Sequence, residues 1–146
     1  MFKYIRHLYR SATSWKYRYF WRKIKGVKKS IADLEFKRFK TLEIREDVRK
    51  AYDKTQHRLD ILKAQMKSEE EKGNKEQAGH IELEVVQVEK EAERYKSQLK
   101  AMDLEVTGSK QTNEYPDGYV GINDTLESLR ELEKMLHVYV TRELDA

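Results

Sequence analysis

The sequence predicts an all-α fold: a long antiparallel helical hairpin formed as a coiled coil, with a basic, aromatic N-terminal helical arm and a C-terminal helix. Composition is the first reason, because charged residues make up 38% of the 146 residues and equal the hydrophobic share, with six Gly and one Pro. That balance is typical of long helices whose surface exceeds their core. Spacing is the second reason, because apolar residues recur at intervals of three and four, which is too regular for disorder.

The uneven distribution of charge separates an arm from a body. Residues 1–40 hold 13 basic and 2 acidic residues, a net charge of +11, whereas residues 41–146 hold 17 basic and 24 acidic residues, a net charge of −7. Residues 1–29 contain ten Lys or Arg, no Asp or Glu and eight of the fifteen aromatic residues. We therefore expect the arm to dock on an anionic surface and the body to act as a spacer or assembly element.

Residues 1–29 form the predicted arm, an amphipathic basic helix with a possible new start at Ser14. Its apolar face is Phe2, Ile5, Leu8, Ala12, Trp15 and Tyr19. Three surfaces suit this mixture: anionic lipid, nucleic acid, or an acidic protein groove such as the body of a neighbouring copy. The residues expected to bind this surface or partner are Lys3, Arg6, Arg10, Trp15, Lys16, Arg18, Trp21, Arg22, Lys23 and Lys25.

Residues 30–106 form the predicted hairpin. Its second helix carries an unbroken coiled-coil seam, spaced alternately by four and three residues: Ile81, Val85, Val88, Ala92, Tyr95, Leu99, Met102 and Val106. Upstream, a matching heptad frame holds Ile24, Val27, Ile31, Leu34, Val48, Tyr52, Leu59, Leu62 and Met66, with Arg38, Thr41, Arg45 and Thr55 at the intervening positions. The two seams are therefore expected to meet over about four heptads.

The turn of the hairpin is predicted at residues 73–74. Gly73 suits the left-handed end of a helix, and Asn74 with Gln77 has the spacing of a capping box. Folding there pairs positions whose numbers sum to 147, such as Met66 with Ile81. Whether the hairpin closes within one chain or swaps with a neighbour stays open, because the turn could also straighten into a continuous helix.

Two features of the first long helix need explanation. Phe36 and Phe39 lie off the seam, on the part that extends beyond the second helix, and call for the C-terminal helix or a second molecule as a partner. Arg38 and Arg45 occupy seam positions, where a charge destabilises the pairing unless a partner satisfies it. The simpler interpretation is that Arg38 is solvated and that Arg45 reaches solvent near the open end of the hairpin.

Residues 107–121 are predicted to be a loop, with Gly108 ending the preceding helix and Pro116, Asp117 and Gly118 forming a turn. Residues 122–146 form the C-terminal amphipathic helix, whose regular part is expected to start at about Asp124. Its apolar face is Leu126, Leu129, Leu132, Leu136, Val140 and Leu144, widened by Met135 and Tyr139.

The residues needed for catalysis or metal binding do not form a recognisable pattern. There is no cysteine, and none of the four histidines, His7, His57, His80 and His137, has a ligand partner at a recognised spacing. No phosphate-binding loop or nucleophile motif occurs. We therefore expect no enzyme activity, no cofactor and no small-molecule substrate.

Residues 1–29 are free of acidic residues and contain Arg and Ser, a composition that overlaps with that of a mitochondrial transit peptide, but other targeting features are not recognisable. No run of about 18 uncharged apolar residues exists, and residues 1–29 lack the apolar centre of a secretory signal. We therefore expect an intracellular protein or one within an assembled particle.

In layout, an amphipathic N-terminal helix followed by a long helical hairpin resembles bacterial phage-shock protein A and the ESCRT filament proteins, which coat membranes. Small all-helical virion components also have a basic arm and a coiled-coil body. These resemblances imply an oligomeric structural protein. The first expectation is thus a non-enzymatic assembly subunit that binds protein partners, including copies of itself; the alternatives are a peripheral membrane-binding protein and a nucleic-acid-binding protein.

Overall fold

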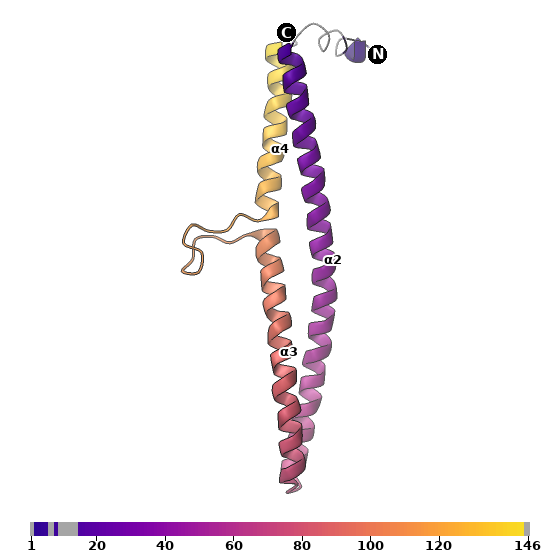
Figure 1. The fold of residues 1–146 in the computed structure, drawn as a ribbon, viewed down its shortest axis with the longest axis vertical. Helices are drawn as coiled ribbons and strands as arrows, with labels where there is room; N and C mark the ends of the chain where they lie inside the picture. Colours follow the sequence, from indigo (N-terminus) through magenta and orange to yellow (C-terminus); the bar gives the residue numbers. More distant parts are fainter. Residues whose placement is uncertain (1, 6–7, 9–14, 145–146) are drawn as a thin grey trace. The chain divides into compact units, whose positions relative to one another are not determined.

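The computed structural model describes residues 2–5, 8 and 15–144. Within them lie α2 (Trp15–Glu71), α3 (Lys75–Thr107) and α4 (Ile122–Tyr139), the last continued by a short π-helix, η1 (Val140–Leu144) (Figure 1). No strand occurs among the described residues, so the prediction of an all-helical fold is confirmed.

The chain divides into two compact units. Unit 1 consists of Met1–Phe39 and Thr107–Ala146, and unit 2 consists of Lys40–Val106. The first part of α2 belongs to unit 1 and the second part to unit 2. Residues 15–29, assigned above to the arm, are the first residues of α2, which continues without interruption through residue 30.

In unit 2, α2 and α3 pack against each other through positions that the heptad pattern predicts. Every predicted seam position of α3, and every one of α2 from Thr41 to Met66, is buried or half-buried. Thr55, a polar seam residue, donates its hydroxyl to the carbonyl of Ala51 at 2.8 Å, which satisfies it within its own helix. One apolar cluster joins the two helices: Leu59 and Leu62 with Ile81, Val85 and Val88, and Met66 packed against them.

The connection between α2 and α3 has the hydrogen bonds of a Schellman motif. The amide of Gly73 donates to the carbonyl of Glu70 at 3.1 Å, and the amide of Asn74 donates to that of Glu69 at 3.0 Å. Gly73 has φ +79°, as its sequence context predicts. The Asn74 side chain donates to the Glu69 carboxylate at 2.8 Å, so it contacts the preceding helix.

In unit 1, the first part of α2 packs against α4 and η1 through two apolar clusters. The first centres on Tyr17, Ile24 and Val140, and the second on Ile31, Ile122 and Leu126. Tyr17 and the half-buried Phe20 were not among the predicted seam residues, although they lie seven residues before Ile24 and Val27 and so continue the same heptad frame.

The C-terminal helix begins at Ile122, the first residue of its predicted range, and Asp124 lies in its first turn. The prediction of its apolar face is wrong in part. Leu132 and Met135 were placed on its buried face, but both are exposed; the inward position after Leu129 is taken by the half-buried Glu133. Glu133 tolerates this position because Lys28 and His137 contact its carboxylate, at 3.9 and 3.6 Å.

The loop between α3 and α4 is held by a pair of backbone hydrogen bonds. Ser109 and Tyr119 exchange N–H···O bonds of 2.8 Å, and the amide of Gly118 donates to the carbonyl of Tyr115 at 2.9 Å. Gly108, at φ +71°, follows the last residue of α3, and Gly118 has φ +77° in the predicted turn. A Cβ at Gly108 would overlap the carbonyl oxygen of Tyr119, so no other residue fits there without movement.

Candidate docking surfaces

Four cations lie in a row on the outer face of α2 in unit 1. This set, here called the basic ridge, consists of Arg18, Arg22, Lys25 and Lys29. The four residues are spaced by four, three and four positions, and all are exposed. At 100° per residue this spacing keeps them within about 60° of one another around the helix. The buried residues Tyr17, Ile24 and Ile31 lie on the opposite side, so the ridge faces away from α4.

No acidic partner neutralises the ridge within residues 15–142. Across this part of the chain, the structure records no hydrogen bond or salt bridge for any of its four side chains. Neighbouring Lys28, by contrast, contacts Glu133 at 3.9 Å. A row of unneutralised cations on one helix face attracts an anionic partner.

Exposed aromatic side chains lie at both ends of the basic ridge. Trp15 is 67% exposed before its first residue, while Phe36 and Phe39 are 63% and 62% exposed after its last. The Nζ of Lys23 lies 5.4 Å from the centroid of the Tyr19 ring, a cation–π contact beside the ridge. Phe36 and Phe39 thus remain largely exposed, and their contact with a second molecule stays a prediction.

Aromatic side chains pack on the side of α2 that faces α4, away from the basic ridge. Tyr17 and Trp21 make an edge contact with ring centroids 6.0 Å apart, and Trp21 makes another with His137 of α4, at 5.6 Å. Phe20 contacts Tyr139 at 4.8 Å. These contacts fix the rotation of α2 in unit 1 and therefore fix which side chains point outward.

The predicted arm residues divide into three groups. Lys3, Trp15, Lys16, Arg18, Arg22, Lys23 and Lys25 are exposed, Trp21 is half-buried, and Arg6 and Arg10 lie outside the described residues. Of the predicted apolar face, Phe2, Ile5, Leu8, Trp15 and Tyr19 are all exposed, and Ala12 lies outside the described residues. Sequence reasoning did not include Lys29, although it continues the spacing of the ridge.

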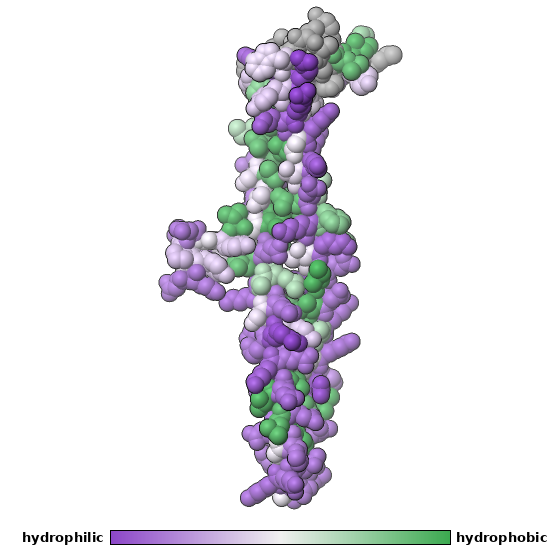
Figure 2. All heavy atoms as spheres, in the orientation of Figure 1, coloured by the Kyte–Doolittle hydropathy of each residue, from purple (hydrophilic) through white to green (hydrophobic). Residues whose placement is uncertain are grey.

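A second exposed apolar surface lies on α4. Leu132, Met135, Val138 and Tyr139 reach solvent there, and Figure 2 shows apolar side chains at the surface on the face it presents. Met135, Val138 and Tyr139 line a shallow groove of about 420 Å³, with Lys134 and Arg142 at its edges.

A polar groove of about 760 Å³ also runs between α2 and α4 in unit 1. Its side chains pair with each other: Arg130 donates to Glu35 at 2.7 Å, and Arg38 donates to Asn123 at 2.7 Å. Arg38 is exposed, as predicted, and its hydrogen bond to Asn123 of α4 is a contact that the sequence did not predict. These two hydrogen bonds join α2 to α4.

Arg45, the other charged seam residue, is satisfied within unit 2. Its Nη2 donates to Oδ2 of Asp103 at 3.4 Å, and its Nε donates to Oδ1. The hydrogen bond to Asp103 raises the pKa of the Arg45 guanidinium above its ordinary value. The expectation that Arg45 only reaches solvent is corrected, because the Asp103 carboxylate lies beside it.

An exposed flank of α3 in unit 2, beside its contact with α2, carries an acidic row. The acidic row consists of Glu82, Val86, Glu89 and Glu93. These residues are spaced by four, three and four positions, and all are exposed. Lys63 of α2 forms a salt bridge of 3.4 Å with Glu89, and both side chains are about half exposed, so this pair lies at the surface beside the exposed Glu82 and Glu93. The exposed Leu83 lies next to this row.

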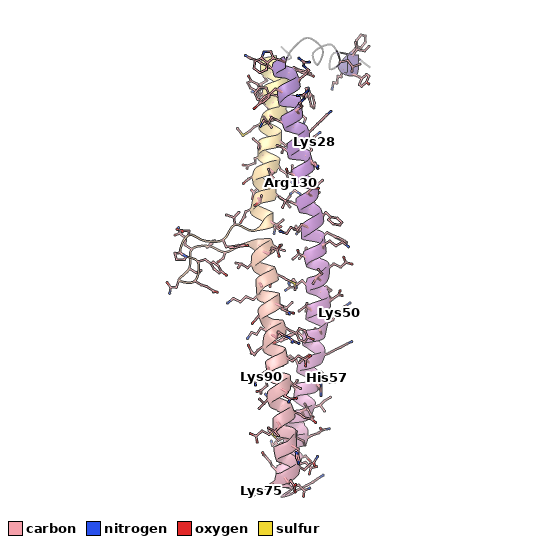
Figure 3. The ribbon with its side chains drawn as sticks, in the orientation of Figure 1. Lys28, Lys50, His57, Lys75, Lys90 and Arg130 are labelled. Carbon is pink, nitrogen blue, oxygen red and sulfur yellow. The ribbon has the colours of Figure 1, made fainter. Side chains whose placement is uncertain are left out.

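The described histidines do not form a metal site. His57 of α2 and His80 of α3 are exposed, and His57 lies at the level of Lys90 on the neighbouring helix (Figure 3). Among the described residues there is no group of three or more side chains of metal-binding type. None of the described helices is long and apolar enough to cross a bilayer.

Comparison of the chain with protein-family models, with curated proteins and with solved structures found no match.

Proposed function

We propose that this protein is a non-enzymatic helical assembly subunit, in which α2 and α3 form an antiparallel coiled-coil hairpin as a spacer and the basic arm is an anchor. The observation that carries the proposal is the outward placement of large apolar and cationic side chains on the arm. Trp15 and Tyr19 are exposed while Tyr17, between them, is buried. The arm therefore has a packed inner side and a separate outer side for a partner.

The packing of unit 2 supports the role of spacer. Two heptad seams meet over most of their length, a tight turn joins the helices, and the charged seam residue Arg45 is paired with Asp103. Paired polar residues in a seam favour one register over others. A single register gives the hairpin a defined length, which is what a spacer requires.

The anchor is tested with the double substitution Trp15→Ser and Tyr19→Ser in the full chain. Both side chains point outward, so helix content by circular dichroism should stay at the wild-type level. We expect the mass of the assembled species, measured by size exclusion with light scattering, to fall towards that of one chain. The matched control replaces Ile44 and Ile61, exposed aliphatic residues of unit 2, with Ser and should keep the wild-type mass. An arm variant that assembles like the wild type would refute the anchor.

A peripheral membrane-binding role is the second candidate, because Phe2, Ile5 and Leu8 are all exposed beside Lys3. Apolar side chains next to cations suit the interface of an anionic bilayer. In a Trp21→Phe variant, the emission of Trp15 reports on the arm alone. A blue shift with phosphatidylserine vesicles, lost after Phe2→Ser and Leu8→Ser, is the expected result; no shift at low salt would rule this role out.

A further inference from the structure

We infer that the anionic partner of the basic ridge is the acidic row of a second copy of this chain. This inference rests on the proposed function, because it names the partner of an assembly subunit. The ridge holds cations at residues 18, 22, 25 and 29, and the row holds carboxylates at three of the four equivalent positions, 82, 89 and 93. Both surfaces run along a helix with the same four-three-four spacing, so the cations of the ridge and the carboxylates of the row lie at matching intervals.

In an antiparallel arrangement of the two helices, the match extends beyond the charged residues. Arg18 then meets Glu93, Arg22 meets Glu89 and Lys29 meets Glu82. The small residues Ala32 and Gly79 face each other, and a Cβ built at Gly79 has no atom within 4 Å, so the helices can approach closely.

At the ends of this contact, each exposed aromatic side chain meets a lysine. Trp15 lies opposite Lys96, and Phe36 lies opposite Lys75, which gives a cation–π contact at each end of the charged stripe. Lys25 meets Val86, whose exposed side chain packs along the aliphatic stem of the lysine.

The chemistry of the ridge separates this partner from a lipid surface. A helix that lies in a bilayer interface needs apolar side chains along the middle of its contacting face. The middle of this face is cationic from residue 18 to residue 29; Trp15 and Phe36 lie at its ends, and Tyr19 lies to one side. A rigid anionic partner with charges at helical spacing fits this pattern, and the acidic row supplies it.

The contact is heterologous, since a ridge on one copy binds a different surface on the next. A pair of copies therefore keeps one free ridge and one free row, and the association continues into an open chain or closes into a ring. The charges remain at the surface, so salt should weaken the association as the Debye length falls from about 10 Å at 0.1 M to about 3 Å at 1 M.

The experiment uses two full-length variants with reversed charges. The ridge variant carries Arg18→Glu and Lys29→Glu, and the row variant carries Glu82→Lys and Glu93→Lys, the residues that meet them. By light scattering, each variant alone should associate at least about tenfold more weakly than the wild type, because like charges now face each other. An equimolar mixture should regain the wild-type mass, because each reversed surface then finds a complementary one.

A matched control carries Lys50→Glu and Lys54→Glu, two exposed cations of α2 in unit 2, and changes the net charge by the same amount as the ridge variant. It should associate like the wild type, and circular dichroism should show unchanged helix content in all variants. Wild-type association by both reversed variants, or a mixture that does not recover, overturns the inference while the assembly role stands. A wild-type chain that stays monomeric refutes both.

Nucleic acid is the remaining partner, and the same variants test it. If the ridge variant assembles like the wild type but loses binding to a single-stranded oligonucleotide, the ridge serves nucleic acid and the inference is overturned. Binding of the oligonucleotide that is equal in wild type and ridge variant, together with the mixing result, supports contact between copies.

A disulfide tests the register. The chain has no cysteine, so each variant, Ala32→Cys or Gly79→Cys, carries a single one. A disulfide between the two different variants can therefore only join residue 32 to residue 79. Oxidation of the mixture should give a 32–79 crosslink, because the two Cα atoms approach within the reach of a disulfide. A parallel arrangement would instead bring residue 32 opposite residue 96, so preferential crosslinking of Ala32→Cys with Lys96→Cys overturns the antiparallel register.

Discussion

Ile24 is fully buried in unit 1 and shows how single positions determine which face of α2 is available to partners. It packs with Tyr17 of α2 and Val140 of η1, so this side of α2 faces the C-terminal helix. Lys25, the next residue, is then forced outward onto the basic ridge. The orientation of the charged surface is therefore a consequence of apolar packing on the other side of the helix.

Truncation of Ile24 tests this packing. We expect Ile24→Ala to lower the free energy of unfolding by about 2–4 kcal/mol, because it removes buried methyl groups and leaves a cavity. Lys25→Ala, the neighbouring exposed change, should stay within about 0.5 kcal/mol of the wild type. Chemical denaturation followed by circular dichroism gives both values, and equal small effects would show that the cluster is not a core.

A charge network on the surface of α2 gives the chain a pH dependence. Arg49 donates to Glu46 at 2.6 Å and to Asp53 at 3.0 Å. The hydrogen bond from Arg49 holds the pKa of Glu46 below its ordinary value of 4.5. Because the folded-state pKa is the lower one, the interaction stabilises the helix above the unfolded-state pKa, and this contribution is lost as pH falls through the folded-state pKa.

The Glu46→Gln variant checks the sign. Gln is uncharged at every pH, so the melting temperature of the variant should fall less than that of the wild type between about pH 6 and about pH 3. Asp47→Asn, an exposed neighbour, is the matched control. A wild type and a Glu46→Gln variant with the same change in melting temperature would show that the network has no effect on stability.

At the scale of elements, glycines mark where the helices end and where they continue. Gly26 lies inside α2 with open space around its Cα, whereas Gly108 has φ +71° and lies against the carbonyl of Tyr119. The same substitution should therefore have opposite effects at the two sites.

We expect Gly26→Ala to raise the free energy of unfolding by about 0.5–1 kcal/mol, because alanine reduces the entropy of the unfolded chain and suits a helix interior. Gly108→Ala should lower it by about 1–3 kcal/mol, because alanine is strained at positive φ and its Cβ meets the loop. Thermal or chemical unfolding of the two variants measures the difference. Destabilisation by Gly26→Ala would show that α2 is interrupted near this residue.

Heptad spacing predicted most of the helical packing from the sequence, since all eight seam positions of α3 are buried or half-buried. It failed where a helix carries two apolar rows. In α2, Trp15 and Tyr19 form one row and Tyr17 and Ile24 another; in α4, Leu132 and Met135 compete with Leu129 and Leu136. The choice depends on the partner helix, which periodicity within one segment does not contain.

The sequence predicted which residue types make up the candidate site, but not which of them share one exposed face of α2. Counting cations identified the arm, and the exposed Phe36 and Phe39 were expected to need a partner. The separation of the basic ridge from Lys28, which is paired with Glu133, depends on how α2 rotates against α4. The hydrogen bond from Arg38 to Asn123 likewise joins residues far apart in the sequence. Such contacts require the tertiary structure.

At the scale of the whole molecule, two charged surfaces support the proposed role of an assembly subunit. The basic ridge on unit 1 and the acidic row on unit 2 have opposite charge and equal spacing, and exposed aromatic side chains flank the basic ridge. Two different complementary surfaces on one chain favour association into larger species over a closed pair.

The most direct measurement is the solution mass of the intact chain, followed by light scattering over a wide range of protein concentration at low salt. One chain has a mass of 17.5 kDa. The assembly role predicts species heavier than this, with a mass that rises with concentration and falls as salt is added. A single species of 17.5 kDa at every concentration would contradict it.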